Sequence, residues 1–259
     1  MRVTVLGCGT SAGVPQIGCD CAVCRSPDPR NKRLRCSILV ETQGQKILFD
    51  TGPDLRRQCL DAGISRLDAL VFTHAHADHL HGLDDIRAIN NVIGRPLPAH
   101  AHADVLQRIQ ERFPYAFGGG QDGRGGFWRP EIQPRPFTGD GPFTIGPALL
   151  LPLAHGHGRS RVWGFRIGKF AYSTDADRLD EAYLEALAGI EVWLVDALRD
   201  KPHPSHSHLH RTLEWIARVR PKQAWLTHMN HEVDYATWQA RLPEGVAPAH
   251  DGLVIELED

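Results

Sequence analysis

Three histidines and an aspartate lie within six residues in the stretch His74-Ala75-His76-Ala77-Asp78-His79. Neutral imidazoles and carboxylates at this spacing are the ligands that zinc, manganese and iron take from proteins. A polar loop with histidines by chance is the alternative, but chance rarely gives a His-x-His-x-Asp-His pattern. Because the stretch directly follows an apolar run at 67–72, which predicts a buried strand, we expect a metal site on the loop at the end of that strand.

Other side chains of metal-ligand type follow predicted strands further along the chain. They are His155 and His157, Asp175, and His228. Loops at the ends of several strands are where a rigid scaffold can assemble a metal site. Together with the first stretch they provide about seven ligands, enough for two metal ions, since one ion needs three or four. The carboxylate of Asp175 suits a bridging position, because each of its oxygens can bind one ion.

The chain has six cysteines, and three of them, Cys19, Cys21 and Cys24, lie within six residues of a polar loop at 15–35. In a reducing compartment such a cluster is more typical of a metal site than of a disulfide. A closed tetrahedral zinc site would need one further ligand. Redox activity of the Cys-x-x-Cys motif is the alternative, but the βαβ context of thioredoxin-like proteins is missing. The other cysteines are expected to be small apolar core residues: Cys8, Cys36 and Cys59.

The elements that must position these residues are predicted from apolar runs and from turn and cap residues. Strands are expected at 2–6, 37–41, 46–50, 67–72, 143–145, 148–153, 162–167, 169–173, 191–196, 223–227 and 253–257. Helices are expected at 54–62, 83–92, 103–113, 179–187, 209–219 and 235–242. Two sheets packed face to face, with the helices outside, would bury all of these strands, so the fold class is α/β.

Two glycine-rich segments interrupt this pattern. The first, at 7–13, follows the first strand, but its Gly-x-Gly-x-x-x-Gly spacing argues against a dinucleotide-binding turn. The second, at 113–126, holds too much glycine for a regular element. It is either a mobile lid over a substrate or an ordinary surface insertion.

The length and charge of the chain exclude several classes of function. At 259 residues it can bury a full two-layer core, and we expect residues 1–259 to form a single domain. Its 29 Lys and Arg against 31 Asp and Glu give a net charge of −2, which provides no basic surface for nucleic acid or for a membrane. No apolar run reaches the length of a membrane span, and the N-terminus has no signal-peptide pattern. We therefore expect a cytoplasmic protein.

Taken together, these residues resemble the hydrolases of the metallo-β-lactamase fold nearly from end to end. Within that fold the chain is most similar to the PhnP-like phosphoribosyl cyclic phosphate phosphodiesterases. The resemblance rests on the glycine-rich start at 7–15, the cysteine cluster at 18–24, the stretch at 74–79, Pro204-Ser205-His206, and Leu226-Thr227-His228-Met229-Asn230-His231. It implies a four-layer αββα sandwich with two mixed β-sheets.

The resemblance also implies a ligand set for two divalent ions, manganese or zinc. The implied ligands are His74, His76 and a downstream histidine for one ion and Asp78, His79 and His228 for the other, with Asp175 as the bridge. Both His155 and His157 could be that downstream histidine. The family pattern, a His-Gly some seven residues before a glycine in the next strand, favours His157 with Gly164. His155 would then lie behind the ligands or at the surface.

A separate structural zinc site is implied as well. In the PhnP-like branch the fourth ligand is a histidine shortly after the last active-site histidine, which in this chain is His231. With Cys19, Cys21 and Cys24 it would pin the loop at 15–35 to the loop after the last core strand. All four positions would be filled by protein, so the role of this zinc would be structural.

Two residues are the candidate catalytic groups, Asp78 and His206. The resemblance makes His206 the histidine that contacts the substrate phosphate and protonates the leaving oxygen. Its neighbours His208 and His210 depart from the family pattern and are expected to face solvent.

The implied reaction is the two-metal hydrolysis of a small phosphodiester, such as a phosphoribosyl cyclic phosphate or a cyclic nucleotide. A general acid favours a substrate with a poor leaving group, such as a sugar hydroxyl. The alternatives are a tRNA-processing or other nuclease on the same fold, a lactone or thioester hydrolase, and a non-catalytic metal-binding protein. The near-zero net charge argues against a nuclease. A homodimer is implied by the resemblance alone.

Overall fold

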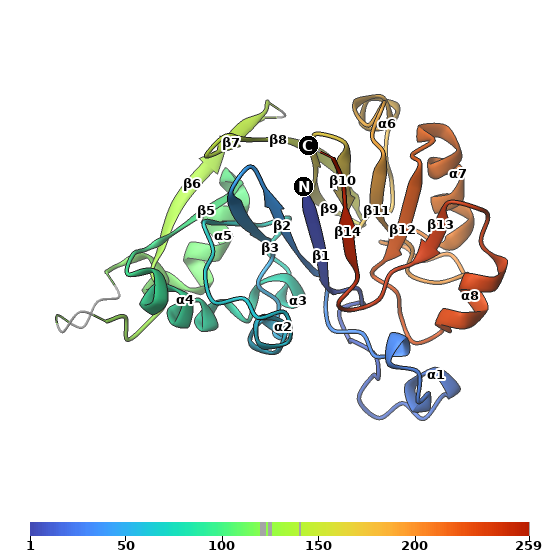
Figure 1. Cartoon of the computed structure of the whole chain (residues 1–259), viewed down its shortest axis with the longest axis horizontal. Helices are drawn as coiled ribbons and strands as arrows, with labels where there is room; N and C mark the ends of the chain where they lie inside the picture. The colour runs from blue at the N-terminus through green and yellow to red at the C-terminus, as the bar shows by residue number, and fades with distance from the viewer. Residues whose placement is uncertain (120–122, 124–125, 140, 259) are drawn as a thin grey trace.

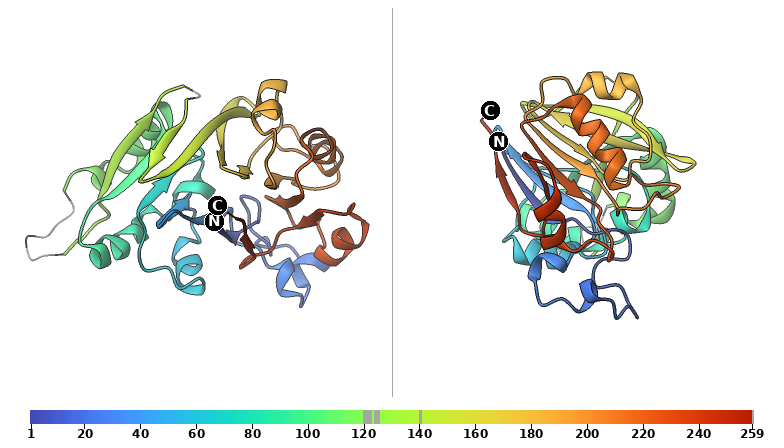
Figure 2. Two further views of the ribbon diagram at one scale, coloured as in Figure 1. Left: turned by 45° about the horizontal axis from the view of Figure 1, so that its top comes forward. Right: turned by 90° about the vertical axis from the view of Figure 1, so that its right-hand side faces the viewer.

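The computed structural model describes residues 1–119, 123, 126–139 and 141–258. Within these residues, two β-sheets of seven strands each lie face to face, with the helices on their outer sides (Figures 1 and 2). This arrangement confirms the two-sheet sandwich and the α/β class expected from the sequence.

The first sheet has the strand order β14-β1-β2-β3-β4-β5-β6. The pairs from β14 to β3 are antiparallel, and those from β3 to β6 are parallel. Its strands are β1 (Arg2–Gly7), β2 (Ser37–Thr42), β3 (Gln45–Phe49), β4 (Ala69–Val71), β5 (Leu97–His102), β6 (Ile132–Phe137) and β14 (Val254–Glu256).

The second sheet has the order β13-β12-β11-β10-β9-β8-β7. It is antiparallel from β7 to β10 and parallel from β10 to β13. Its strands are β7 (Phe143–Ile145), β8 (Ala148–His157), β9 (Ser160–Ile167), β10 (Phe170–Ser173), β11 (Val192–Asp196), β12 (Gln223–Thr227) and β13 (Val246–Pro248).

The helices lie mostly in the connections between parallel strands, as crossover connections require. The α-helices are α1 (Ala22–Arg25), α2 (Leu55–Asp61), α3 (Ala77–Leu80), α4 (Ile86–Ile93), α5 (Ala103–Arg112), α6 (Glu181–Ala186), α7 (Leu209–Val219) and α8 (Tyr235–Arg241). Short 3₁₀ turns occur at η1 (Pro29–Asn31), η2 (Leu83–Asp85) and η3 (Pro114–Phe117). None of the helices in the described part of the chain has the length and apolar character needed to cross a lipid bilayer.

The core between the sheets is made of aliphatic and aromatic side chains. Phe49 of β3 meets Phe165 of β9 edge-to-face at 5.4 Å between ring centroids, and it meets Tyr172 of β10 at 6.1 Å. The central parallel strand β11 is buried along its whole length, which fits its unbroken apolar sequence. This rigid interior holds the ends of the strands in fixed positions, and the site residues lie on the loops that leave those ends.

Three strands, β5, β6 and β13, were not predicted from the sequence. β5 contains Pro98 and polar His100 and His102 between its apolar residues, and β6 contains two prolines and exposes its four central residues. Proline and exposed polar residues in an edge strand weaken the apolar pattern from which strands are predicted. β5 and β6 extend the first sheet to its edge at β6, and β13 forms one edge of the second sheet.

Two further expectations concern the position of His155 and His157 and the glycine-rich segment at 113–126. His155 and His157 lie inside β8 and not beyond its end, because β8 keeps its pairing with β9 as far as His157, which faces Ser160. Of the predicted glycine-rich lid at 113–126, residues 120–122 and 124–125 lie outside the described residues. Its described start forms η3, and its role as a lid stays a prediction.

Candidate metal centre

The predicted metal loop lies between β4 and α3, at the end of the first sheet. Thr73 donates from its backbone N–H and from its hydroxyl to the carboxylate of Asp50, at 2.9 and 2.8 Å. His76 is the residue before α3, and Asp78 and His79 lie within this short helix. The end of β3 therefore fixes the start of the loop, and the short helix directs its later side chains.

Glycines allow the chain to come unusually close behind this loop. A Cβ on Gly52 would lie 2.2 Å from the carbonyl oxygen of Asp78, and one on Gly82 would lie 2.0 Å from the carbonyl oxygen of Gly52. Thr51 also donates its N–H to the carbonyl of His79 at 2.8 Å. Any larger residue would push the helix and its ligands away from the centre.

The structure brings three predicted ligands, His74, His76 and His157, into one group. Each offers a nitrogen atom, and these atoms all lie within 4.8 Å of one another. The rings of His74 and His76 are 4.5 Å apart, and those of His76 and His157 are 5.1 Å apart. His155, the other candidate for the downstream position, belongs to none of the ligand groups that the described residues form. The structure therefore places His157, and not His155, beside His74 and His76, and its role as a ligand stays a prediction.

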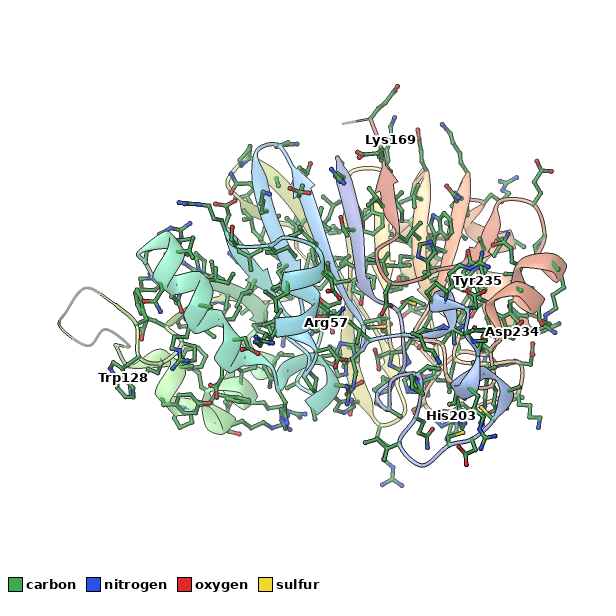
Figure 3. The ribbon with its side chains drawn as sticks, turned by 60° about the horizontal axis from the view of Figure 1, so that its bottom comes forward. Arg57, Trp128, Lys169, His203, Asp234 and Tyr235 are labelled. Carbon is green, nitrogen blue, oxygen red and sulfur yellow. The ribbon has the colours of Figure 1, made fainter. Side chains whose placement is uncertain are left out.

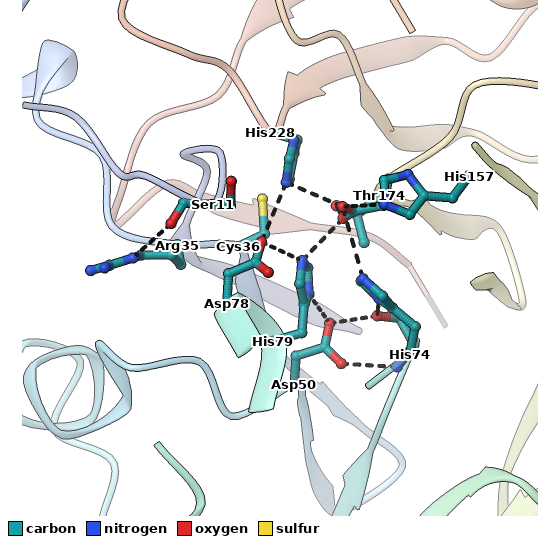
Figure 4. A network of polar contacts seen from close by, with 12 residues as sticks. Ser11, Arg35, Cys36, Asp50, His74, Asp78, His79, His157, Thr174 and His228 are labelled. Atoms are coloured by element: carbon teal, nitrogen blue, oxygen red, sulfur yellow. Dashed lines mark hydrogen bonds and ion pairs between the residues drawn. The ribbon is translucent and has the colours of Figure 1, made fainter. Parts of the chain in front are cut away.

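A second group consists of Asp78, His79, Asp175 and His228, again within 4.8 Å. Figure 4 labels Asp78, His79 and His228 of this group. Asp175 Oδ2 lies 3.1 Å from His79 Nε2, and Asp175 Oδ1 lies 3.3 Å from His228 Nε2. Asp175 also reaches the first group, at 3.9 Å from His157 Nε2. Its carboxylate therefore lies between the two groups.

Two of these ligands follow the ends of parallel strands in strained backbone. Asp175, after β10, has φ 55°, and His228, after β12, has φ 59°. Non-glycine residues rarely adopt this left-handed conformation, which costs of order 1–3 kcal/mol and occurs mainly at functional sites. The sharp turn directs both side chains back over the ends of the strands.

Hydrogen bonds orient the histidine rings so that Nε2 points inward. Nδ1 of His79 bonds to Asp50 Oδ2 at 2.7 Å, and Nδ1 of His157 bonds to the carbonyl oxygen of Ser205 at 2.6 Å. In His74 the neighbour of Nδ1 is the hydroxyl of Thr73 at 2.9 Å. Carboxylates and carbonyls in this position fix the tautomer of metal-binding histidines.

The buried polar atoms of these residues indicate that they can bind a pair of metal ions. Nε2 of His74, His79 and His228 is buried and has no hydrogen-bond partner among the described residues. Buried polar atoms without partners are costly, and three that converge on one carboxylate need a common partner. A divalent cation bound by imidazole nitrogens and carboxylate oxygens meets that need.

The carboxylates of Asp175 and Asp78 carry the negative charge that cation binding requires. Burial alone would raise the pKa of the Asp175 carboxyl, but His228 and His79 hold it well below its usual value. Burial opposes the ionisation of Asp78 in the same way, yet His79 and His228 lower its pKa. Both groups are therefore anionic near neutral pH, as cation ligands must be.

Two buried carboxylates that were not predicted as site residues, Asp50 and Asp196, support the site. Asp50 directly follows β3, with φ 63°, and Asp196 is the last residue of β11. Asp50 accepts from Thr73 and His79, and Asp196 Oδ2 lies 3.0 Å from Nδ1 of His206. Both stand where a strand ends, so the rule that identified Asp175 and His228 would have identified them as well.

His206 lies beside both ligand groups. Its ring is 4.7 Å from that of His157 and 4.5 Å from that of His228. Burial would lower the pKa of His206, but the adjacent carboxylate of Asp196 raises it to about 9. His203, labelled in Figure 3, lies on the outer side, 5.2 Å from the His206 ring.

His208 and His210 belong to none of the ligand groups that the described residues form. His210 is exposed, as expected, and pairs with Glu214 one turn along α7. His208, the residue that precedes α7, is half-buried and does not face solvent fully as expected.

The predicted zinc ligands Cys19, Cys21, Cys24 and His231 come together at the lower edge of the molecule, around α1 (Figure 1). Cys19 Sγ lies 3.0 Å from His231 Nδ1, and Cys24 Sγ lies 3.9 Å from the same nitrogen. The N–H of Gln16 points to Cys24 Sγ at 3.4 Å, and that of Cys24 points to Cys21 Sγ at 3.4 Å. Backbone N–H groups directed at sulfur stabilise thiolates, the form of cysteine that binds zinc.

The cysteines outside the cluster follow the expectation in part. Cys8 and Cys36 are buried in the core, whereas Cys59 is only half-buried and packs against its edge.

Comparisons with known proteins agree with this geometry. The model of the Beta-lactamase superfamily domain matches residues 45–229. A crystal structure described as a new diphosphatase from the PhnP family is 37% identical and superposes with a TM-score of 0.91, over 99% of this chain and 98% of that one. Zn²⁺-bound PqqB from Methylobacterium extorquens has a TM-score of 0.80 over 99% of this chain and all of its own, but at 19% identity it shows the fold alone.

Among curated sequences, a protein of Porphyromonas gingivalis named Octanoyltransferase is 37% identical over 98% of this chain. The chain spans only 51% of that protein. A Coenzyme PQQ synthesis protein B of Rhodopseudomonas palustris is 34% identical over 41% of this chain and 37% of its own length.

Proposed function

We propose that this chain, which belongs to the metallo-β-lactamase superfamily, hydrolyses a small phosphodiester with two divalent metal ions. Its family and its resemblance to the PhnP-family diphosphatase make it a metal-dependent hydrolase. The finer assignment is a cyclic phosphodiester, such as a phosphoribosyl cyclic phosphate or a cyclic nucleotide. The observation that carries it is the position of His206, next to two ligand groups joined by Asp175.

The ligand roles follow from the two groups. His74, His76 and His157 would hold one ion, and Asp78, His79 and His228 would hold the other. Asp175 would lie between them as the shared ligand, since its Oδ1 lies 3.9 Å from His157 Nε2 of the first group and its Oδ2 lies 3.1 Å from His79 Nε2 of the second. When bound, the two ions lower the pKa of water to give a nucleophile near neutral pH and neutralise charge on the phosphate. Manganese and zinc both accept this ligand set.

His206 supplies the proton that the leaving oxygen needs. Asp196 accepts a hydrogen bond from Nδ1 of His206, so Nε2 is the nitrogen that can contact the substrate. The same carboxylate favours the protonated ring, which makes His206 a proton donor at neutral pH. A sugar alkoxide is a poor leaving group and gains much from such a donor, whereas a p-nitrophenolate gains little. This difference favours a sugar phosphodiester as the substrate.

The cysteine cluster has a structural role in this proposal. Its four ligands would fill the coordination of one zinc ion and leave no open position for a substrate. His231 lies three residues after His228, so this zinc would fix the segment that carries one ligand of the metal centre. The site would thus hold the loop at 15–35 against the end of β12.

A second candidate substrate is a diphosphate. The PhnP-family neighbour, at 37% identity over nearly the whole chain, is described as a diphosphatase. A phosphoanhydride has a good leaving group, so its cleavage would depend less on the proton from His206. The two candidates therefore differ in what the loss of His206 does.

A substrate panel with added manganese or zinc tests the proposal. We expect turnover of 2′,3′-cyclic nucleotides, of a phosphoribosyl cyclic phosphate and of bis(p-nitrophenyl) phosphate. Nucleoside diphosphates and dinucleoside diphosphates test the second candidate. A precursor tRNA, a lactone and a thioester test the nuclease and the other hydrolases. If no phosphate compound turns over with either metal, the proposal is wrong.

A further inference from the structure

A groove of about 1150 Å³ lies beside the metal centre, between β8, the turn that leads to β9, and helices α6 and α7. None of the ligands proposed above lines it. Its apolar walls include Leu151 and Leu153 of β8, Tyr183 of α6 and Trp215 of α7. Its size is close to that of pockets for small organic ligands, about 300–1,000 Å³.

Four arginines line the same groove, and two of them have no partner among the described residues. Arg159 and Arg161 lie exposed at the β8–β9 turn, and no described residue forms a hydrogen bond or an ion pair with either guanidinium. Arg178 instead bonds to the carboxylate of Asp177 at 3.2 Å, and Arg211 donates to the carbonyl of Asp177 at 2.8 Å. The two free guanidinium groups are suited to a phosphate, which arginine binds through paired N–H groups.

The other acidic side chains of the groove are engaged elsewhere. Asp180 accepts from the N–H of Tyr183 at 2.8 Å and so caps α6, while Glu214 pairs with His210. Neither is needed to neutralise Arg159 or Arg161. The free positive charge at the turn is therefore available to a ligand.

Two buried acceptors without partners lie in the floor of the groove. His155 and Asp177 are only 6% and 3% exposed. Nδ1 of His155 faces the carbonyl of Gly156 at 3.3 Å and so carries the hydrogen, which leaves Nε2 of the neutral ring as an acceptor. Neither this Nε2 nor Asp177 Oδ1 has a hydrogen-bond partner among the described residues. Acceptors of this kind call for a ligand with hydroxyl groups.

The side chain of Arg178 covers part of this floor. A Cβ on Gly156 would lie 2.7 Å both from Asp177 Oδ1 and from Arg178 Nη2, so the three groups are in contact there. The Arg178 side chain is 67% exposed and can change its rotamer. Such a change would open Asp177 Oδ1 to the groove and add a third guanidinium to the phosphate site.

We propose that this groove binds a nucleoside phosphate. The phosphate binds Arg159 and Arg161, the ribose hydroxyls donate to His155 Nε2 and Asp177 Oδ1, and the base packs on the apolar wall at Trp215. Free charge, unpaired acceptors and apolar surface occur together in the groove, and a nucleotide carries the complement of each.

The groove backs directly onto the metal centre. His155 lies two residues before His157, and Asp177 lies two residues after Asp175. The N–H of Gly156 bonds to the carbonyl of Arg178 at 3.2 Å, and that of Asp177 bonds to the carbonyl of Gly156 at 3.0 Å. A bound nucleotide would therefore contact the two segments that carry His157 and Asp175.

Isothermal titration of the full-length protein with adenosine 5′-monophosphate tests the proposal without turnover. We expect saturable binding that persists in Asp175→Asn, a variant that disables the metal centre. The double variant Arg159→Gln/Arg161→Gln should bind at least about tenfold more weakly, because charged hydrogen bonds are lost. Arg56 of α2 and Arg108 of α5 are exposed and do not line the groove, so Arg56→Gln/Arg108→Gln removes the same charge as a control.

His155→Phe and a ligand without ribose hydroxyls test the floor. Wild type should bind 2′,3′-dideoxyadenosine 5′-monophosphate more weakly than the ribonucleotide, and His155→Phe should reduce that difference. The proposal is overturned if wild type shows no saturable binding, or if equal affinity for both nucleotides is found. Binding that Asp175→Asn abolishes while the double arginine variant keeps it would place the nucleotide in the metal centre and would also overturn the proposal.

Discussion

The two groups of metal-ligand residues in this protein are assembled in opposite ways. The ligands of the metal centre come from both sheets and from segments between His74 and His228, and most of them are buried. The cysteine cluster takes three ligands from one turn of chain at 19–24, and only His231 is distant. The first site thus depends on the whole fold, whereas the second depends on one loop and one contact.

The difference extends to what holds each ligand in place. In the metal centre, Asp50, Asp196 and the carbonyl of Ser205 orient individual histidine rings. In the cysteine cluster, backbone N–H groups of the loop itself point at sulfur. Loss of one group that orients a histidine ring should lower the metal affinity of the metal centre only partly. Loss of one thiolate removes one of the four ligands of the cysteine cluster.

The largest effect is expected from Asp175→Asn, which removes the negative charge between the two groups. Metal affinity should fall by more than about 100-fold, the upper range for residues that only support a ligand. Phosphodiesterase turnover should therefore disappear. Metal content by mass spectrometry, together with a bis(p-nitrophenyl) phosphate assay, measures both. Retained zinc at the cysteine cluster is part of the expectation, and loss of all metal would contradict the independence of the two sites.

Substitution of His206 should leave both metal sites occupied and remove the proton donor. For His206→Ala we expect kcat to fall by about 10²–10⁴-fold on a cyclic nucleotide, the usual range for a general acid. The loss on bis(p-nitrophenyl) phosphate should be much smaller, because p-nitrophenolate leaves without a proton. His210→Ala, an exposed histidine of the same stretch, is the matched control. Equal losses on both substrates would exclude proton donation as the role of His206.

Asp50 should act on the metal centre through His79 and not by contact with the substrate. Asp50→Asn keeps the size of the side chain but removes the charge that fixes the His79 ring, so metal affinity should fall by about 10–100-fold. Titration with a competing chelator measures this affinity, and excess metal should restore kcat. Asp61→Asn, an exposed carboxylate on α2, is the control. An unchanged metal affinity would make Asp50 purely structural.

The same contrast explains what could be predicted from the sequence. The stretch 74–79 and the cysteine cluster were visible because their ligands are close along the chain. Asp175 and His228 were found because each follows an apolar strand, and the same rule applied to Asp50 and Asp196 would have found them. β5 and β6 were missed because proline and polar residues hide their pattern. The groove beside α6 and α7 is lined by segments more than 50 residues apart, from Leu151 to Trp215. No local sequence pattern could therefore predict it.

The smallest effect on turnover, and the sharpest test of the comparison, comes from Cys21→Ser. Serine is neutral and a poor ligand for zinc, so the variant should lose one zinc per chain and keep the metal pair. Since His231 lies close to His228 in sequence, kcat should change only a few-fold while the thermal unfolding midpoint falls. Cys59→Ser, a half-buried cysteine outside the cluster, should keep every metal ion. Full metal content in Cys21→Ser would refute the zinc site, whereas loss of the catalytic pair as well would show that the local site supports the distributed one.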